Sequence, residues 1–317
     1  MPGFVTHYLF GVDAYKKIKT DSIRMNLKKN HSAYSLGLQG PDIFFFYLPS
    51  YLLHKQNIGD LAHRKDTGAF FSYLLESRIL FDGKPKYLKI ADAYITGFIG
   101  HYILDSIVHP YVYAFTKYNP DKAPKNSEYF GQHAYFETEI DNELLYLKKG
   151  LTPSNFRQDS VIRLSKMQKK VITKMLTYAY TNTYSNITVY NSQIKSAIHW
   201  MVMGTRLRHD PSGQKKVVVR FVEKVLFDRP FISAMMASDH HKFVLNCFNL
   251  NNKTWIHPWT KEKSNESFFD LYEKALSIYT KKIVSYYQLV HNGYKETERQ
   301  AYAKAYGNRS FISGLTL

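Results

Sequence analysis

Three side chains able to bind a metal ion recur at intervals of four residues in the apolar segment GFIGHYILDSIVHPYVYAF, residues 97–115. They are His101, Asp105 and His109, which on an α-helix form one stripe spanning about 80° of its surface. His133 and Glu137 repeat this spacing further along the chain. Because an imidazole and a carboxylate four residues apart can bind one divalent ion without straining a helix, these five residues predict a metal site.

A buried polar network is the alternative, since a single pair of this kind is common by chance and a buried histidine is usually a satisfied core residue. Buried carboxylates need a partner or a metal ion, however, and repeated pairs favour the metal. The candidate ligands offer nitrogen and oxygen but no sulfur, which is typical of catalytic rather than structural zinc, with manganese or iron also possible. The single cysteine, Cys247, excludes an internal disulfide and a thiolate zinc site.

The elements that position these residues are predicted to be helices, because most of the chain shows helical periodicity and little of it alternates as strands do. We predict an all-α protein, with one domain over residues 1–317. Residues 1–140 make most of the metal site, and helices over 150–317 support it. The predicted helices cover residues 11–29, 58–81, 88–115, 129–148, 157–182, 189–208, 213–227 and 264–290. Residues 39–49, 81–86, 117–126 and 251–265 are predicted loops, from their glycine, proline and asparagine content.

The composition predicts a folded protein that attracts anions. The chain has 317 residues, of which 44% are hydrophobic, and a formal net charge of +17. This charge favours phospholipid head groups, phosphate esters or nucleic acid as partners, with a merely solvated basic surface as the alternative. We recognise no nucleic-acid-binding module. We also recognise no secretory signal, and the ionisable residues within 90–115 are costly in lipid, so the expected location is the cytoplasm.

Several short motifs occur in an order that resembles one protein family. They are THYLFG near the start, then GPDIFFF, IGDLAHRKDTGAFF, HYILDSIVHP and HAYFE, and together they span about residues 1–140. This combination looks like the zinc-dependent phospholipase C family, which is similar in fold to the P1-type zinc nucleases. The resemblance implies an all-helical domain with a cluster of two or three zinc ions in a cleft.

The resemblance also implies which residues bind each ion. One zinc would be held by Asp42, His63, His101 and Asp105. Asp105 would bridge to a second zinc, whose other ligands would be His7 and the amine and carbonyl of the N-terminal residue. A third zinc would be held by His109, His133 and Glu137. From the residues alone, a role other than metal binding is favoured for each of three of these residues. Asp42 would be a turn residue, His63 a surface residue of a helix and His7 part of the chain terminus.

Two departures from the family pattern affect these assignments. Secreted members begin, after processing, with a tryptophan whose amine binds zinc, whereas this chain begins Met1-Pro2, so removal of Met1 would expose the Pro2 amine. Four residues also separate Asp105 from His109 here, where the secreted members use six. An interval of four keeps both side chains on one face of a continuous helix.

The predicted function is therefore that of a zinc-dependent phosphodiester hydrolase, most similar to a phospholipase C, in which Asp42 is the candidate general base for the attacking water. The predicted partners are a phospholipid or another phosphodiester, and an anionic membrane surface. Single-stranded nucleic acid ranks below them. A nuclease of the P1 type and a non-catalytic helical protein with a vestigial metal site are the alternatives. Members that select choline have a tyrosine and a phenylalanine at the positions of Ile43 and Asp60, which speaks against choline here. No oligomeric state is predicted.

Overall fold

The computed structural model describes residues 3–47, 49–50, 57–121, 126–227, 230, 232–237, 239 and 247–317, without the side chains of 126–130 and 227. Its α-helices are α1 (Phe4–Lys17), α2 (Asp21–Lys29), α3 (His31–Gly37), α5 (Ile58–Arg64), α6 (Thr67–Glu76), α7 (Pro85–Phe115), α8 (Asn126–Lys149), α9 (Gln158–Val161), α10 (Lys166–Thr183), α11 (Asn191–Arg208), α12 (Gln214–Phe227), α13 (Phe268–His291) and α14 (Glu296–Lys304). Short 3-10 helices are η1 (Gly40–Phe46), η2 (Ser77–Phe81), η3 (Pro153–Asn155) and η4 (Ser233–Met235). The predicted all-α fold is confirmed.

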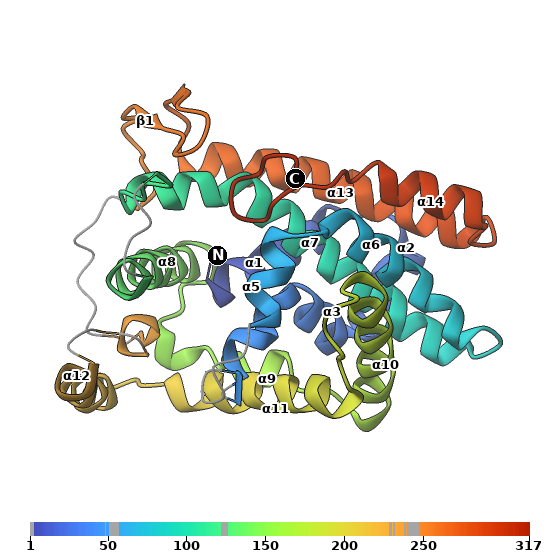
Figure 1. Cartoon of the computed structure of the whole chain (residues 1–317), viewed down its shortest axis with the longest axis horizontal. Coiled ribbons are helices and arrows are strands. Elements are labelled where there is room, and N and C mark those ends of the chain that lie inside the picture. The colour runs from blue at the N-terminus through green and yellow to red at the C-terminus, as the bar shows by residue number, and fades with distance from the viewer. Residues whose placement is uncertain are drawn as a thin grey trace.

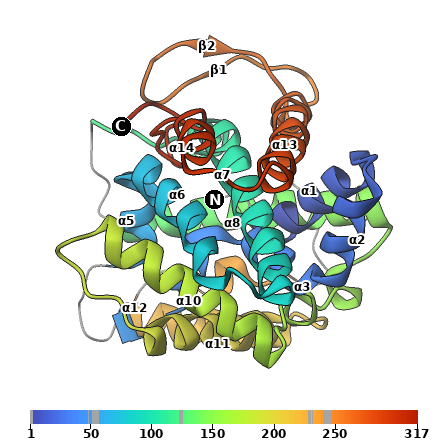
Figure 2. The same ribbon diagram turned by 90° about the vertical axis from the view of Figure 1, so that its right-hand side faces the viewer.

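Helix α7 is the central element of the fold. It is buried along most of its length, and Figures 1 and 2 show it enclosed by α1, α3, α6, α8 and α13. Two glycines let α3 approach it closely. A Cβ at Gly37 would lie 2.3 Å from a backbone oxygen of α7, and one at Gly97 would lie 2.2 Å from a backbone oxygen of α3. This close approach brings the chain that follows α3 against the middle of α7.

Several predicted helices are wrong in their extent. The predicted helix over 11–29 is two helices, since Ile18 is extended and ends α1. The predicted helix over 58–81 is interrupted at Asp66, whose φ of 53° is left-handed, and it ends in η2. The predicted helix over 157–182 is interrupted before Ser165, which caps a new helix through a reciprocal capping box with Gln168. In each case a local backbone conformation or cap outweighs a continuous apolar pattern.

Two of the predicted loops contain regular structure. Residues 40–46 form η1 rather than an open loop. Within 251–265, strands β1 (Trp255–Ile256) and β2 (Lys263–Ser264) pair antiparallel, so α13 begins at Phe268 rather than at 264. Helices α3 and α14 were not predicted. Among the residues that the structure describes, no helix is both long and apolar enough to cross a membrane.

Candidate metal centre

Helix α7 presents His101, Asp105 and His109 as one buried stripe. The helix runs without interruption through the interval between Asp105 and His109, and all three side chains are at most 1% exposed. Helix α8 lies beside it and contributes His133 and Glu137, whose Nε2 and Oε1 atoms are 2.8 Å apart. Glu137 Oε1 is also 3.9 Å from His109 Nε2, so the two helices meet at this pair of side chains.

Asp42 and His63 come from the segments that follow α3. Gly40 has a φ of 50°, and a Cβ there would lie 2.2 Å from the ring of His101. Glycine therefore permits both the left-handed turn and the close passage that lead into η1 and Asp42. His63, on α5, has its Nε2 atom 3.2 Å from Asp42 Oδ1 and 3.6 Å from Asp105 Oδ2.

Helix α1 brings His7 to the second carboxylate oxygen of Asp105. His7 Nε2 lies 3.0 Å from Asp105 Oδ1, whereas Asp105 Oδ2 lies 3.2 Å from His101 Nε2. The rings of His7 and His101 stack with their centroids 4.4 Å apart. Each carboxylate oxygen of Asp105 thus lies near a different imidazole of this stacked pair.

Three of the histidines are oriented by backbone carbonyls on the side away from the centre. The Nδ1 atom of His63 is 2.6 Å from the Gly59 oxygen, and that of His101 is 3.1 Å from the Leu38 oxygen. The Nδ1 atom of His109 is 2.5 Å from the Phe311 oxygen. Because a carbonyl only accepts, each Nδ1 carries a proton, and Nε2 is left as the atom that faces the centre, which is the usual arrangement of metal-binding histidines.

The atoms that face the interior of the centre fit a bound zinc ion. Several of these atoms have no hydrogen-bond partner of normal geometry within the part of the chain that the structure describes. They are Nε2 of His7, His63, His101 and His109, Oδ1 of Asp42 and both carboxylate oxygens of Asp105. Two ligands of a tetrahedral zinc are about 3.4 Å apart, given Zn–N and Zn–O distances near 2.0 Å. The nitrogen–oxygen separations described above scatter around that value.

The ligand atoms fall into three groups, each with its atoms within 4.8 Å of one another. The groups are Asp42, His63 and His101; His7, His101 and Asp105; and His109, His133 and Glu137. All eight side chains predicted as ligands are therefore brought together, and His101 is shared by two of the groups. Met1 and Pro2 lie outside the described residues, so the role of the N-terminal amine as a zinc ligand stays a prediction.

Burial sets the protonation of most imidazoles here. It lowers the pKa of His7, with the neighbouring His101 acting in the same direction. Burial also holds the pKa values of His109 and His133 well below the ordinary imidazole value. Since only a neutral imidazole can bind a metal ion, these three rings have the required form at neutral pH.

The carboxyl groups of the centre have pKa values shifted in different directions. Burial opposes the charge of Asp105, but His101 and His109 outweigh it and hold the pKa of this carboxyl well below its ordinary value. Burial likewise lowers the pKa of His63, but Asp105 and Asp42 together raise it to about 9. Burial raises the pKa of Glu137 well above its ordinary value. A bound cation would favour the ionised form of each of these carboxyl groups and would compete with the proton on His63.

Residues distant in sequence from the ligands hold the centre in place, and they were not predicted. Phe311 supplies the carbonyl for His109, and its ring lies 5.0 Å from the ring of His63 and 5.7 Å from that of His101. Its own N–H donates to the His63 carbonyl over 3.1 Å. No periodicity marks residues 310–315 as part of a site, so local sequence carried no signal for this packing.

Asp141 is a second residue that holds the centre in place. Its spacing of four from Glu137 could have indicated this residue from the sequence. It lies one helical turn after Glu137 on α8, and its carboxylate accepts from the Val5 N–H at 3.0 Å and from the N–H and hydroxyl of Thr6 at 2.8 and 2.7 Å. A Cβ at Gly3 would lie 2.2 Å from one of its oxygens. Asp141 therefore anchors the first turn of the helix that carries His7.

Replacing Asp141 with alanine is expected to lower the free energy of unfolding by about 1–3 kcal/mol, because it leaves buried donors of α1 without an acceptor. Burial raises the pKa of this carboxyl to about 6, so the anion is the form present at pH 7, where urea unfolding should be measured. Asp141→Asn, which keeps one acceptor oxygen, should lose less. Equal urea midpoints for Asp141→Ala and the unmodified protein would rule out the anchoring role.

An all-α fold with adjoining groups of buried imidazoles and carboxylates is typical of zinc-dependent hydrolases. The family model for zinc dependent phospholipase C matches residues 6–198, more than half of the chain and all eight candidate ligands. The protein belongs to the zinc-dependent phospholipase C family. Comparisons with curated proteins and with solved structures gave no match.

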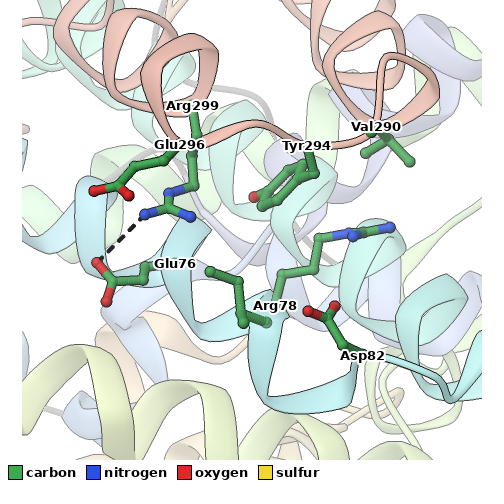
Figure 3. Close-up of a pocket in the computed structure, with 9 residues that line it drawn as sticks. Glu76, Arg78, Asp82, Val290, Tyr294, Glu296 and Arg299 are labelled. Carbon is green, nitrogen blue, oxygen red and sulfur yellow. Dashed lines mark ion pairs between the residues drawn. The ribbon is translucent and has the colours of Figure 1, made fainter.

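An open pocket of about 450 Å³ lies elsewhere, between η2 and the turn that joins α13 to α14. None of the candidate metal ligands lines it. Figure 3 shows Glu76 and Arg299 facing one another across it, with 3.7 Å between their charged atoms. Arg78 also lines it, but its guanidinium is bound to Asp92. Both arginines of this pocket are thus already paired with carboxylates, and we assign the pocket no ligand.

Proposed function

We propose that the protein is a phosphodiesterase that hydrolyses phospholipids in the manner of a phospholipase C, at a centre of two or three zinc ions. The observation that carries the proposal is the convergence of three adjoining ligand groups. Among the described residues, the inward atoms of six of these ligands have no hydrogen-bond partner of normal geometry, namely those of His7, Asp42, His63, His101, Asp105 and His109. The proposed ligands are His7, Asp42, His63, His101, Asp105, His109, His133 and Glu137.

When bound, the zinc ions would polarise the phosphoryl group and lower the pKa of the attacking water. Asp42 is proposed as the general base that accepts the proton from this water. Its Oδ1 atom lies 3.2 Å from His63 Nε2 and 3.7 Å from Nε2 of His101, the histidine that two groups share. Asp105 would place negative charge between the groups, and the carbonyls behind His63, His101 and His109 would keep the three rings from turning.

Choline selection is not part of this proposal. Ile43, at one of the two positions that choline-selecting members use, is fully buried in the apolar core. Asp60, at the second of these positions, has a side chain that is half exposed. Its carboxylate pairs with Arg64 at 2.8 Å and is not directed to the metal centre. Neither side chain can form an aromatic wall around a quaternary ammonium group.

The proposal is tested by a hydrolysis screen of protein purified without a nickel column and then loaded with zinc. We expect hydrolysis of bis(p-nitrophenyl) phosphate and release of diacylglycerol from phospholipid vesicles, both abolished by a chelator and restored by zinc. Preferential, salt-sensitive hydrolysis of single-stranded RNA or DNA would instead favour a nuclease. Protein that neither binds zinc nor gains thermal stability from it would contradict both activities.

A further inference from the structure

Helix α12 turns its apolar face outward. Six of its side chains are between 46% and 69% exposed, namely Val217, Val218, Phe221, Val222, Val225 and Leu226. Their spacing of one, three, one, three and one places them on a single face of the helix. The helix lies beyond residue 198, where the family match ends. Such a contiguous exposed apolar face marks a surface that binds something.

The polar side of α12 faces the protein and fixes this orientation. Glu223 is 4% exposed, and its carboxylate accepts from the Ser233 hydroxyl at 2.5 Å and from the backbone N–H groups of Ile232 and Ser233. At the start of the helix, the Lys216 N–H donates to Asp210 over 2.8 Å. The apolar face therefore cannot turn inward without breaking these buried hydrogen bonds.

Positive charges border the apolar face. Lys215, Arg220 and Lys224 are exposed, and Glu223, the single acidic residue of the helix, is buried and hydrogen-bonded. The exposed charges of α12 are thus all cationic. An apolar stripe bordered by lysine and arginine matches the boundary between the acyl chains and the head groups of an anionic bilayer.

The position of α12 links it to the metal centre. Ala234, in η4 directly after the segment that Glu223 binds, accepts a hydrogen bond from the Thr138 hydroxyl over 3.1 Å. Thr138 follows Glu137 on α8, and Figure 1 shows α12 and α8 on the same side of the molecule. The side chains of His133 and Glu137 are 11% and 12% exposed. The side chains of the other six candidate ligands are less exposed than these two. The most accessible edge of the centre therefore lies on the helix against which η4 packs.

We propose that α12 is an interfacial helix that binds this protein to an anionic phospholipid surface. A second copy of the chain fits the face less well, since pairing two such faces would bring their cationic borders together. The inference deepens the proposed function and rests on it for the identity of the lipid as substrate, whereas the binding itself is measurable without turnover.

The test is co-sedimentation of the full chain with vesicles of phosphatidylcholine, with and without phosphatidylserine. We expect tighter binding to the vesicles with phosphatidylserine, and weaker binding as salt is raised. The double variant Phe221→Ser/Val225→Ser should bind at least about tenfold more weakly, because two exposed apolar side chains no longer enter the bilayer. The matched control is Met25→Ser, which removes a side chain 66% exposed on α2, at the other end of the molecule in Figure 1, and should bind as the unmodified protein does.

A second variant tests the cationic residues that border the apolar face. Lys215→Gln/Lys224→Gln should remove much of the preference for phosphatidylserine. Lack of binding to either vesicle, or equal binding by the apolar double variant, would overturn the inference. So would a dimer in solution that the apolar double variant converts to a monomer, because a second copy would then cover the face. Asp105→Asn should still bind vesicles, so failure of the hydrolysis screen and failure of membrane binding can be told apart.

Discussion

Replacing Asp105 with asparagine is expected to remove at least one zinc ion per chain and to lower kcat/KM for phosphodiester hydrolysis by at least about a hundredfold. Both carboxylate oxygens lie in the centre, one 3.0 Å from His7 and the other 3.2 Å from His101. Asparagine has nearly the same shape but lacks the charge, and its amide nitrogen cannot bind a metal ion. Zinc per chain by elemental analysis and hydrolysis of bis(p-nitrophenyl) phosphate measure the two effects.

The matched control is Asp60→Asn, the same chemical change on α5, the helix that carries His63. Its carboxylate is half exposed and paired with Arg64, which is itself exposed, so zinc content and activity should be unchanged. Full zinc content in Asp105→Asn would refute the role of Asp105 as a shared ligand. If Asp105→Asn kept its zinc but lost activity, Asp105 would have a role in the reaction but not in binding the ion.

Replacing Arg78 with methionine is expected to lower the free energy of unfolding by about 3–5 kcal/mol and the melting temperature by roughly 10 °C. Arg78 binds Asp92 of α7 with two hydrogen bonds of 2.6 and 3.3 Å, and the Tyr286 hydroxyl of α13 donates to the same carboxylate. Asp92 is 4% exposed, so methionine would leave a buried carboxylate without its counter-charge. Thermal and urea unfolding measure the loss.

The control for this variant is Arg64→Met, which breaks a surface pair and should cost no more than about 0.5 kcal/mol. Burial raises the pKa of Asp92 even though Arg78 opposes the shift. Removing Arg78 should raise that pKa further, so the folded variant binds a proton that the unfolded chain releases. Its stability deficit should therefore shrink as pH falls from 8 to 5. A deficit that is small at pH 8, or that grows toward pH 5, would contradict this account.

Local periodicity was enough to predict the central part of the metal centre. A spacing of four places His101, Asp105 and His109 on one face of any helix, whatever surrounds it, and the same holds for His133 and Glu137. Asp42, His63 and His7 had no such pattern and were assigned from the family resemblance. Their positions depend on the turn at Gly40 and on how α1 and α5 pack, which are not local properties.

The predicted helix boundaries were wrong for a related reason. Apolar spacing continues through Ile18, Asp66 and the segment before Ser165, but an extended residue, a left-handed residue and a capping box end the helices there. Each is a preference of one or two residues that a window of a dozen averages away. The outward apolar face of α12 shows the opposite limit, since its spacing alone would have predicted that this face is buried.

By itself, the sequence determined the all-α fold, the stripe on α7, the pair on α8 and the family, because these depend on residue type and short-range spacing. Only the tertiary structure decided that His7 and His63 approach different carboxylate oxygens of Asp105, that Phe311 and Asp141 hold them there, and that α12 faces solvent. These features depend on contacts between residues 42 to 202 positions apart, or on which side of a helix its neighbours cover. Such contacts form when helices pack and leave no periodic trace in the chain.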